Sequence, residues 1–136
     1  MPFMSEQELP PWLREQVSRL QQLQQNLQAI MMQKQQVELE VVEIDRALEE
    51  LKKIGADDVV YKSAGPLLIR AKKEDVTKEL EEKKELSNTR VMVLTKQETR
   101  VKDNLKEVEN KINQMIRGAQ GTAVGSPQSS KPKVND

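Results

Sequence analysis

The chain has 136 residues, and its 22 basic and 22 acidic side chains give a formal net charge of zero. Aromatic residues make up only 2% of the chain and charged residues 32%, so we expect an extended unit rather than a large spherical core. Cysteine and histidine are absent, which excludes thiolate and imidazole nucleophiles, zinc sites built on these residues, and disulfides.

The first nine residues have no basic region followed by an apolar stretch, so they do not match a secretory signal. We expect residues 1–9 to form a flexible N-terminus of a cytoplasmic protein. The longest apolar runs, residues 29–32 and 91–94, are far shorter than the roughly 20 residues that a membrane span needs. We therefore expect no membrane among the partners.

A seven-residue repeat of apolar residues predicts a long helix over residues 10–54. Its a positions are Leu13, Leu20, Leu27, Lys34, Val41 and Leu48, and its d positions are Gln16, Leu23, Ile30, Val37, Ile44 and Leu51. Ten of these twelve residues are apolar. Such a narrow stripe stays in contact with water unless a partner helix covers it, so the repeat requires a second helix.

Residues 58–72 differ from the helical repeat and predict a β-hairpin, because two β-rich runs flank Ala64-Gly65-Pro66. The pattern places Val59, Tyr61 and Ile69 on one face and Val60 and Leu68 on the other. A lone hairpin with two free edges is marginal in water, and its own helices could cover one face at most. We therefore expect it to pair with hairpins of other subunits. The candidate assembly residues are Val59, Val60, Tyr61, Leu67, Leu68 and Ile69.

A second repeat predicts a helix over residues 74–117 and supplies the partner. Its a positions are Thr77, Lys84, Val91, Glu98, Leu105 and Ile112, and its d positions are Leu80, Ser87, Leu94, Val101, Val108 and Met115. The short connector forces the helices to run antiparallel, which places Leu20 opposite Val108 and Leu48 opposite Leu80. The predicted fold class is mainly α: a long antiparallel two-helix coiled coil with one β-hairpin at the elbow.

Charged residues interrupt the apolar seam, and two of them, Lys34 and Glu98, lie close to each other in the predicted register. The register places Lys34 opposite Leu94 and Glu98 opposite Ile30, in neighbouring layers where the charges can meet. An ion pair at this point would fix the register of the two helices. The alternative is that both long side chains reach out of the seam into solvent.

The end of the predicted coil has apolar residues without a seam partner, namely Leu9, Trp12, Val17 and Ile116. Exposed apolar groups suggest a binding surface, although Trp12 and Leu9 could instead fold over the coil end as a cap. Residues 118–136 have too few apolar residues to offset the entropy of ordering, so we expect a disordered tail.

The sequence shows no catalytic, cofactor-binding or metal-binding motif. The five glycines match neither phosphate-binding loop pattern, so nucleotide hydrolysis is not expected. The acidic pairs at 49–50, 57–58 and 81–82 are interpreted as solvated surface, because a two-helix coil offers no pocket to shift a pKa. Basic residues are interleaved with acidic ones and have no aromatic neighbours, so no nucleic acid is expected as a partner.

Three stretches resemble the archaeal prefoldin beta subunit: Leu20-Gln-Gln-Leu-Gln-Gln-Asn-Leu, Arg46-Ala-Leu-Glu-Glu-Leu and Val60-Tyr-Lys-Ser-Ala-Gly-Pro-Leu-Leu-Ile-Arg. The order of repeat, single hairpin and repeat of matched length extends the resemblance over residues 9–117. A single hairpin resembles the beta type, because the alpha type has a longer connector that forms two.

The resemblance implies a hexamer of two alpha and four beta subunits, whose hairpins join in an inter-subunit β-barrel. It also implies an ATP-independent chaperone that captures unfolded client polypeptides at the coiled-coil tips and passes them to a group II chaperonin. The client-binding residues carried onto this sequence are Leu9, Trp12, Leu13, Val17, Ile112, Met115 and Ile116. The alternative is a structural coiled-coil tether without client binding, with the hairpin as an oligomerisation module.

Overall fold

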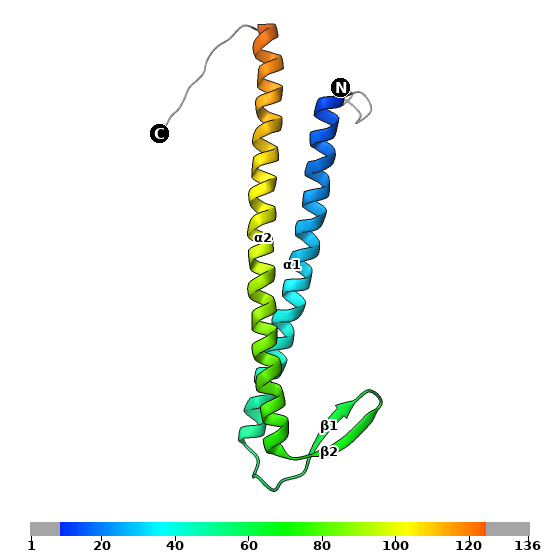
Figure 1. The fold of residues 1–136 in the computed structure, drawn as a ribbon, viewed down its shortest axis with the longest axis vertical. Helices are drawn as coiled ribbons and strands as arrows, with labels where there is room; N and C mark the ends of the chain where they lie inside the picture. Colours follow the sequence, from blue (N-terminus) through cyan, green and yellow to red (C-terminus); the bar gives the residue numbers. More distant parts are fainter. Residues whose placement is uncertain (1–8, 125–136) are drawn as a thin grey trace, which may run out of the picture. The chain divides into compact units, whose positions relative to one another are not determined.

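The computed structural model describes the backbone of residues 9–124 and the side chains of residues 9–118. The elements follow in the order α1 (Pro11–Lys52), β1 (Val60–Ala64), β2 (Leu67–Ala71) and α2 (Lys73–Val124) (Figure 1). The chain divides into two compact units, unit 1 (Met1–Gln28 and Thr99–Asp136) and unit 2 (Ala29–Glu98). Residues 1–8 of the expected flexible N-terminus and residues 125–136 of the expected tail lie outside the described residues.

The start of α1 follows from its two prolines. The Pro10 carbonyl accepts hydrogen bonds from the backbone N–H groups of Leu13 at 3.0 Å and Arg14 at 2.8 Å. Pro11 is the first helical residue, where a missing N–H costs nothing because that group has no partner inside the helix. The helix ends at Lys52, two residues before the expected end.

The boundaries of α2 agree with the sequence at the start and differ at the end. Glu74 and Asp75 occupy the first turn, where negative charge interacts favourably with the helix dipole. The helix continues to Val124, whereas residue 117 was the expected end and the tail was expected from residue 118. Gly118 does not stop it, because one glycine costs a helix only about 1 kcal/mol relative to alanine and no proline follows before Pro127.

The heptad seam is confirmed by the burial pattern. All twelve a and d positions of each predicted repeat are buried or half-buried. In unit 2 the most buried apolar side chains are Val37, Ile44, Leu51 and Leu94, and in unit 1 it is Val108. Side chains on the other helix positions are mostly exposed. The core of each unit is therefore a narrow stripe between two helix segments, as a seven-residue repeat requires.

Contacts within unit 2 show that its two helix segments run antiparallel. Lys34 of α1 pairs with Glu98 of α2, and Asp45, further along α1, pairs with Lys84, which comes earlier in α2. Among the described residues, no helix is long and apolar enough to cross a membrane.

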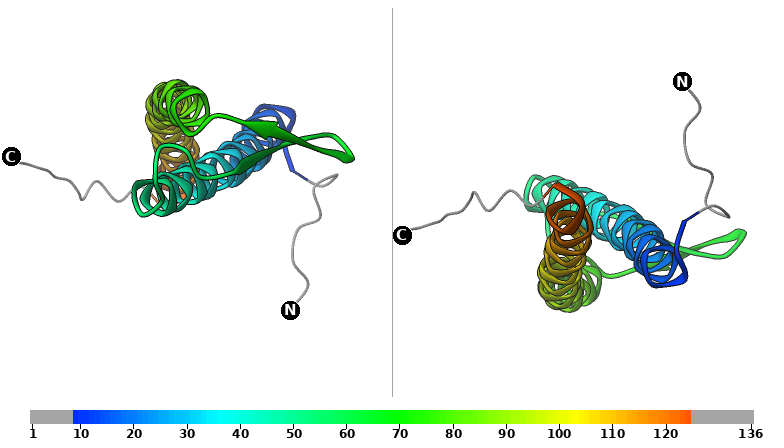
Figure 2. Two further views of the ribbon diagram at one scale, coloured as in Figure 1. Left: turned by 90° about the horizontal axis from the view of Figure 1, so that it is seen from below. Right: turned by 90° about the horizontal axis from the view of Figure 1, so that it is seen from above.

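The β-hairpin connects the end of α1 to the start of α2 and projects away from the helix ends that it joins (Figures 1 and 2). Its two strands are antiparallel, and the pairing of Ala64 with Leu67 leaves a two-residue turn, Gly65-Pro66. Gly65 has a φ of 60°, which suits the first central position of a type II′ turn and favours glycine. The hairpin is thus closed by the tightest of the common turns.

Candidate functional site

The β-hairpin presents apolar side chains to solvent along its whole length. Tyr61 is 60% exposed, Leu67 63%, Leu68 73% and Ile69 47%. Val59, just before β1, is also exposed, while Val60 is half-buried. These six residues are the predicted assembly set, and the structure places five of them on one two-stranded sheet and Val59 directly before it.

The strand pairing corrects the expected division of these residues between the two faces. Directly paired residues share a face of a sheet, and Lys62 pairs with Ile69 while Ser63 pairs with Leu68. Ile69 therefore shares a face with Val60 rather than with Tyr61, and Leu68 lies on the Tyr61 face. The expectation was wrong because the turn is two residues long, and a change of one residue moves a strand's side chains to the opposite face.

Polar contacts tie the base of the hairpin to the helices. Lys62 Nζ lies 2.9 Å from Glu79 Oε2 of α2, and Lys73 Nζ donates to the Ile54 carbonyl at 2.7 Å. Both contacts lie within unit 2. The Lys62–Glu79 pair links β1 to α2, but apolar side chains stay exposed on both hairpin faces: Leu67 and Ile69 on the Lys62 face, and Tyr61 and Leu68 on the other.

The predicted client-binding residues all lie in unit 1, near the start of α1 and in the matching turns of α2. Trp12 and Ile116 are exposed, at 42% and 37%. The remaining five are half-buried: Leu9, Leu13, Val17, Ile112 and Met115. Leu13, Ile112 and Met115 occupy seam positions, so the helices already shield part of each side chain.

The exposure of Trp12 bears on the alternative in which this residue caps the coil end. A capping indole would lose most of its contact with water, yet Trp12 keeps 42% of its surface exposed. The Arg14 guanidinium donates to the Leu9 carbonyl at 3.0 Å, which holds the chain that enters α1. The arrangement leaves the indole available on the surface of unit 1.

Sequence reasoning missed a group of exposed apolar side chains on the helices of unit 2. They lie outside the a and d positions, so a search for the heptad seam passes over them. The group comprises Met31, Met32, Leu39, Val42, Leu86, Met92 and Val93. The available signal was the count of apolar residues on the outer positions of the repeat, which a soluble coil usually fills with polar residues.

The charged seam residues Lys34 and Glu98 meet in unit 2. Lys34 Nζ lies 3.0 Å from Glu98 Oε1, and their side chains are 24% and 13% exposed. Most of both side chains is therefore shielded, rather than reaching into solvent. A second polar seam residue, Ser87, is 2% exposed and donates from Oγ to Glu40 Oε1 at 2.9 Å.

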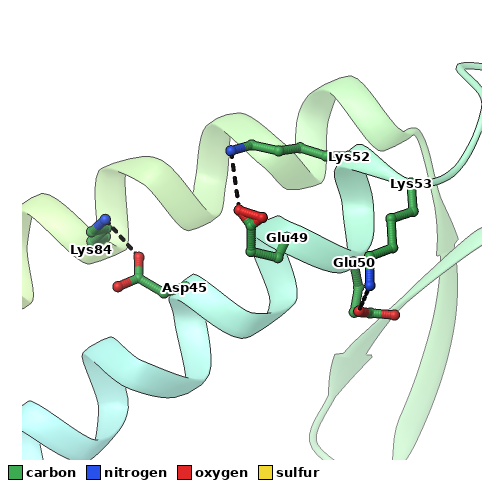
Figure 3. A network of polar contacts seen from close by, with 6 residues as sticks. All are labelled: Asp45, Glu49, Glu50, Lys52, Lys53 and Lys84. Carbon is green, nitrogen blue, oxygen red and sulfur yellow. Dashed lines mark hydrogen bonds and ion pairs between the residues drawn. The ribbon is translucent and has the colours of Figure 1, made fainter.

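The acidic clusters form surface ion pairs and a loop contact. Figure 3 shows Glu49 paired with Lys52 and Glu50 with Lys53 along α1, at 3.4 and 2.9 Å. Asp58 accepts a hydrogen bond from the Gly55 N–H at 2.6 Å. Among the described residues, no group of three or more acidic side chains could hold a metal ion.

Open depressions on unit 2 are lined largely by charged residues. One, of about 450 Å³, lies between the helices and includes Asp45, Lys84 and the seam residue Thr77. The Thr77 hydroxyl is buried there without a hydrogen-bond partner among the described residues. Carboxylates also line this depression, but among the described residues none is hydrogen-bonded to the Thr77 hydroxyl as a general base would be.

Comparisons with known proteins agree with this arrangement of helices and hairpin. The family model described as "Prefoldin subunit" matches residues 14–119. The chain belongs to the prefoldin family. Prefoldin is a family of chaperone subunits, and this subunit assembles with other prefoldin subunits into an oligomer.

The curated relatives are prefoldin beta subunits of archaea. The protein from Archaeoglobus fulgidus is 43% identical over 109 residues, which cover 80% of this chain and 94% of the relative. The protein from Caldivirga maquilingensis is 38% identical over 117 residues, covering 86% and 97%. The crystal structure of the prefoldin beta subunit from Thermococcus strain KS-1 matches with a TM-score of 0.73 at 34% identity, covering 85% of this prefoldin chain and 98% of that one.

Proposed function

We propose that this chain is the beta-type subunit of a cytoplasmic prefoldin hexamer of two alpha and four beta subunits. The hexamer captures unfolded polypeptides at its coiled-coil tips without ATP and delivers them to a group II chaperonin. The single observation on which tip capture rests is the exposure, in unit 1, of Trp12 in the first turn of α1 and of Ile116 about two turns before the end of α2. The proposed client surface, called the tip set, is Leu9, Trp12, Leu13, Val17, Ile112, Met115 and Ile116.

The proposed assembly element is the hairpin. Its exposed residues lie on both faces, so folding onto the chain's own helices cannot cover all of them. Two free strand edges offer unpaired backbone groups that another hairpin can bond. Pairing with neighbouring hairpins in a closed β-barrel removes these edges and buries the apolar side chains, which supports an inter-subunit barrel.

The mechanism of client capture follows from the small apolar area that each coiled-coil tip exposes. A non-native chain exposes apolar segments, and one pair of exposed residues such as Trp12 and Ile116 offers little area for binding them. Several tips that hold one client together gain affinity through effective concentration. Weak single contacts also allow stepwise release, so transfer to a chaperonin needs no nucleotide from this subunit. The proposal assigns the chain no catalytic role, because it has neither a cysteine nucleophile nor a histidine to activate a serine.

Client capture is tested by light scattering. A chemically denatured client is diluted, without nucleotide, into this chain co-assembled with an alpha-type partner, and aggregation is followed over time. We expect suppression at near-stoichiometric amounts of hexamer. The variant Trp12→Ser, Val17→Ser, Ile116→Ser should require about tenfold more complex for the same suppression, because avidity compounds a loss at every beta tip.

The control changes three apolar residues outside the tip set that are even more exposed, Met32→Ser, Leu39→Ser and Val42→Ser. This control should suppress aggregation as the unmodified complex does. If both triple variants lose the same activity, capture does not take place at the tip set. If the intact hexamer, verified by mass, leaves client aggregation as fast as in buffer, the chain is better explained as a structural tether.

A further inference from the structure

Polar side chains bridge the two helices of unit 2 at three levels. The three pairs are Lys34–Glu98 at 3.0 Å, Ser87–Glu40 at 2.9 Å and Lys84–Asp45 at 2.6 Å. Figure 3 shows the last of these pairs reaching from α2 to α1. Each pair includes at least one residue at an a or d position, so the bridges lie in or beside the apolar seam.

The apolar part of the seam does not define one register. A heptad seam looks nearly the same to its partner after a slip of seven residues, because leucine, isoleucine and valine recur at every layer. Such a slip moves the two helices by about 10 Å along their axes at 1.5 Å per residue. The seam therefore holds the helices together without choosing strongly among neighbouring registers.

The ion pair between Lys34 and Glu98 distinguishes these registers. After a slip of one heptad, Lys34 would meet Val91 or Leu105 in place of Glu98. Both charges lie mostly shielded, at 24% and 13% exposure, so each would lose its partner and much of its contact with water. An unpaired shielded charge is strongly unfavourable, and this penalises both slipped registers.

The bridge between Ser87 and Glu40 also disfavours the slipped registers. Ser87 is 2% exposed, so its hydroxyl needs a hydrogen-bond partner within the protein. A slip would place Glu40 beside Leu80 or Leu94 and remove the bridge. The Lys84–Asp45 bridge discriminates less, because one slip would bring Lys84 to Glu38 instead.

We propose that Lys34–Glu98 and Ser87–Glu40 form a register lock, which selects one alignment of α1 and α2 from the set that the apolar seam permits. The lock accounts for polar residues at positions where apolar ones would pack more favourably. In the observed alignment, Lys73 at the start of α2 donates a hydrogen bond to the carbonyl of Ile54, just beyond the end of α1.

The register can be read by cysteine cross-linking, because the chain has no cysteine of its own. Val91→Cys is combined with Val37→Cys to report the observed alignment. Two other variants, called the slip reporters, combine Val91→Cys with Ile44→Cys or with Ile30→Cys. Each of them reports a slip of one heptad, in opposite directions. Disulfide formation within one chain is measured on the full-length protein at monomer mass.

In the otherwise unchanged chain, the Val37 reporter should form most of the intrachain disulfide and the two slip reporters little. The lock is then removed with Lys34→Leu and Glu98→Leu together. We expect cross-linking of at least one slip reporter to rise about fivefold or more, while the melting temperature stays the same or increases. A gain in stability with a loss of register is the signature that distinguishes a lock from an ordinary stabilising ion pair.

The matched control is Thr77→Val, which removes another polar seam residue of α2 that forms no bridge. It should leave both slip reporters at their original level. The charge exchange Lys34→Glu with Glu98→Lys should also keep the original register, because it restores the pair. Slip reporters that stay at the original level in the leucine double variant would overturn the proposal, as would an equal rise in the Thr77→Val chain.

Discussion

The seam and the β-hairpin of unit 2 differ in where their apolar side chains find a partner. Seam residues such as Val37 and Ile44, each 4% exposed, are covered by the other helix of the same chain. Hairpin residues such as Leu67 and Leu68, at 63% and 73%, are not covered within the described residues. The seam is thus covered within one chain, whereas the hairpin leaves its apolar side chains exposed, which fits its proposed role as the assembly element.

The largest expected effect comes from introducing charged residues into the apolar hairpin. Val60→Asp with Leu68→Asp places one carboxylate on each hairpin face, according to the observed strand pairing. Burying these charges in an interface without partners is strongly unfavourable, so we expect the oligomer to dissociate completely. Light scattering coupled to gel filtration measures the mass, and circular dichroism should show unchanged helix content.

The control for this prediction charges exposed residues on α1, Leu39→Asp with Val42→Asp. These side chains are 59% and 49% exposed and lie outside the hairpin. The oligomer should keep its mass in this control. An unchanged mass in the Val60 and Leu68 variant would mean that the hairpin is not the oligomerisation element.

The seam was predictable because it is a local and repeated pattern. Each a or d position is set by its distance along the chain from the previous one, so no tertiary information was needed to place all twelve positions on each helix. Polar exceptions such as Ser87 and Gln16 were placed by the repeat even though their own chemistry suggested exposure. Both are buried, at 2% and 9%.

The hairpin faces were not predictable to the same degree. The presence of a hairpin followed from the β-rich runs around Gly65-Pro66, but the faces depended on the turn length. Pairing of Ala64 with Leu67 was not visible in the sequence, and it reassigned Ile69 and Leu68. The expected end of α2 at residue 117 was also wrong, because the Gly118 that follows costs a helix too little to end it.

A matched pair of leucines on α2 sharpens the contrast between buried and exposed apolar residues. Leu94 is a seam residue with 9% exposure, and Leu86 is 64% exposed. Leu94→Ala should lower the free energy of unfolding by about 2–4 kcal/mol, because it removes buried methyl groups and leaves a cavity. Leu86→Ala should change it by about 0.5 kcal/mol or less.

Urea denaturation followed by circular dichroism measures the free energy of unfolding of both variants. The protein concentration is kept the same, because assembly contributes to apparent stability. The ratio of the two effects tests the burial assignment directly. Equal effects would mean that Leu86 is covered in the assembly, which would extend the interface from the hairpin onto α2.

The smallest expected effects come from replacing Gly65 or Gly118 with alanine. Gly65→Ala forces a residue with a side chain into φ 60°, and Cβ meets no atom within 4 Å, so the cost is backbone strain alone, about 1 kcal/mol. Gly118→Ala lies in a helix with open space for Cβ, so it should stabilise α2 by about 1 kcal/mol. Melting temperatures should therefore move in opposite directions. A stabilising Gly65→Ala would contradict the two-residue turn, and a destabilising Gly118→Ala would contradict the continuation of α2 past residue 117.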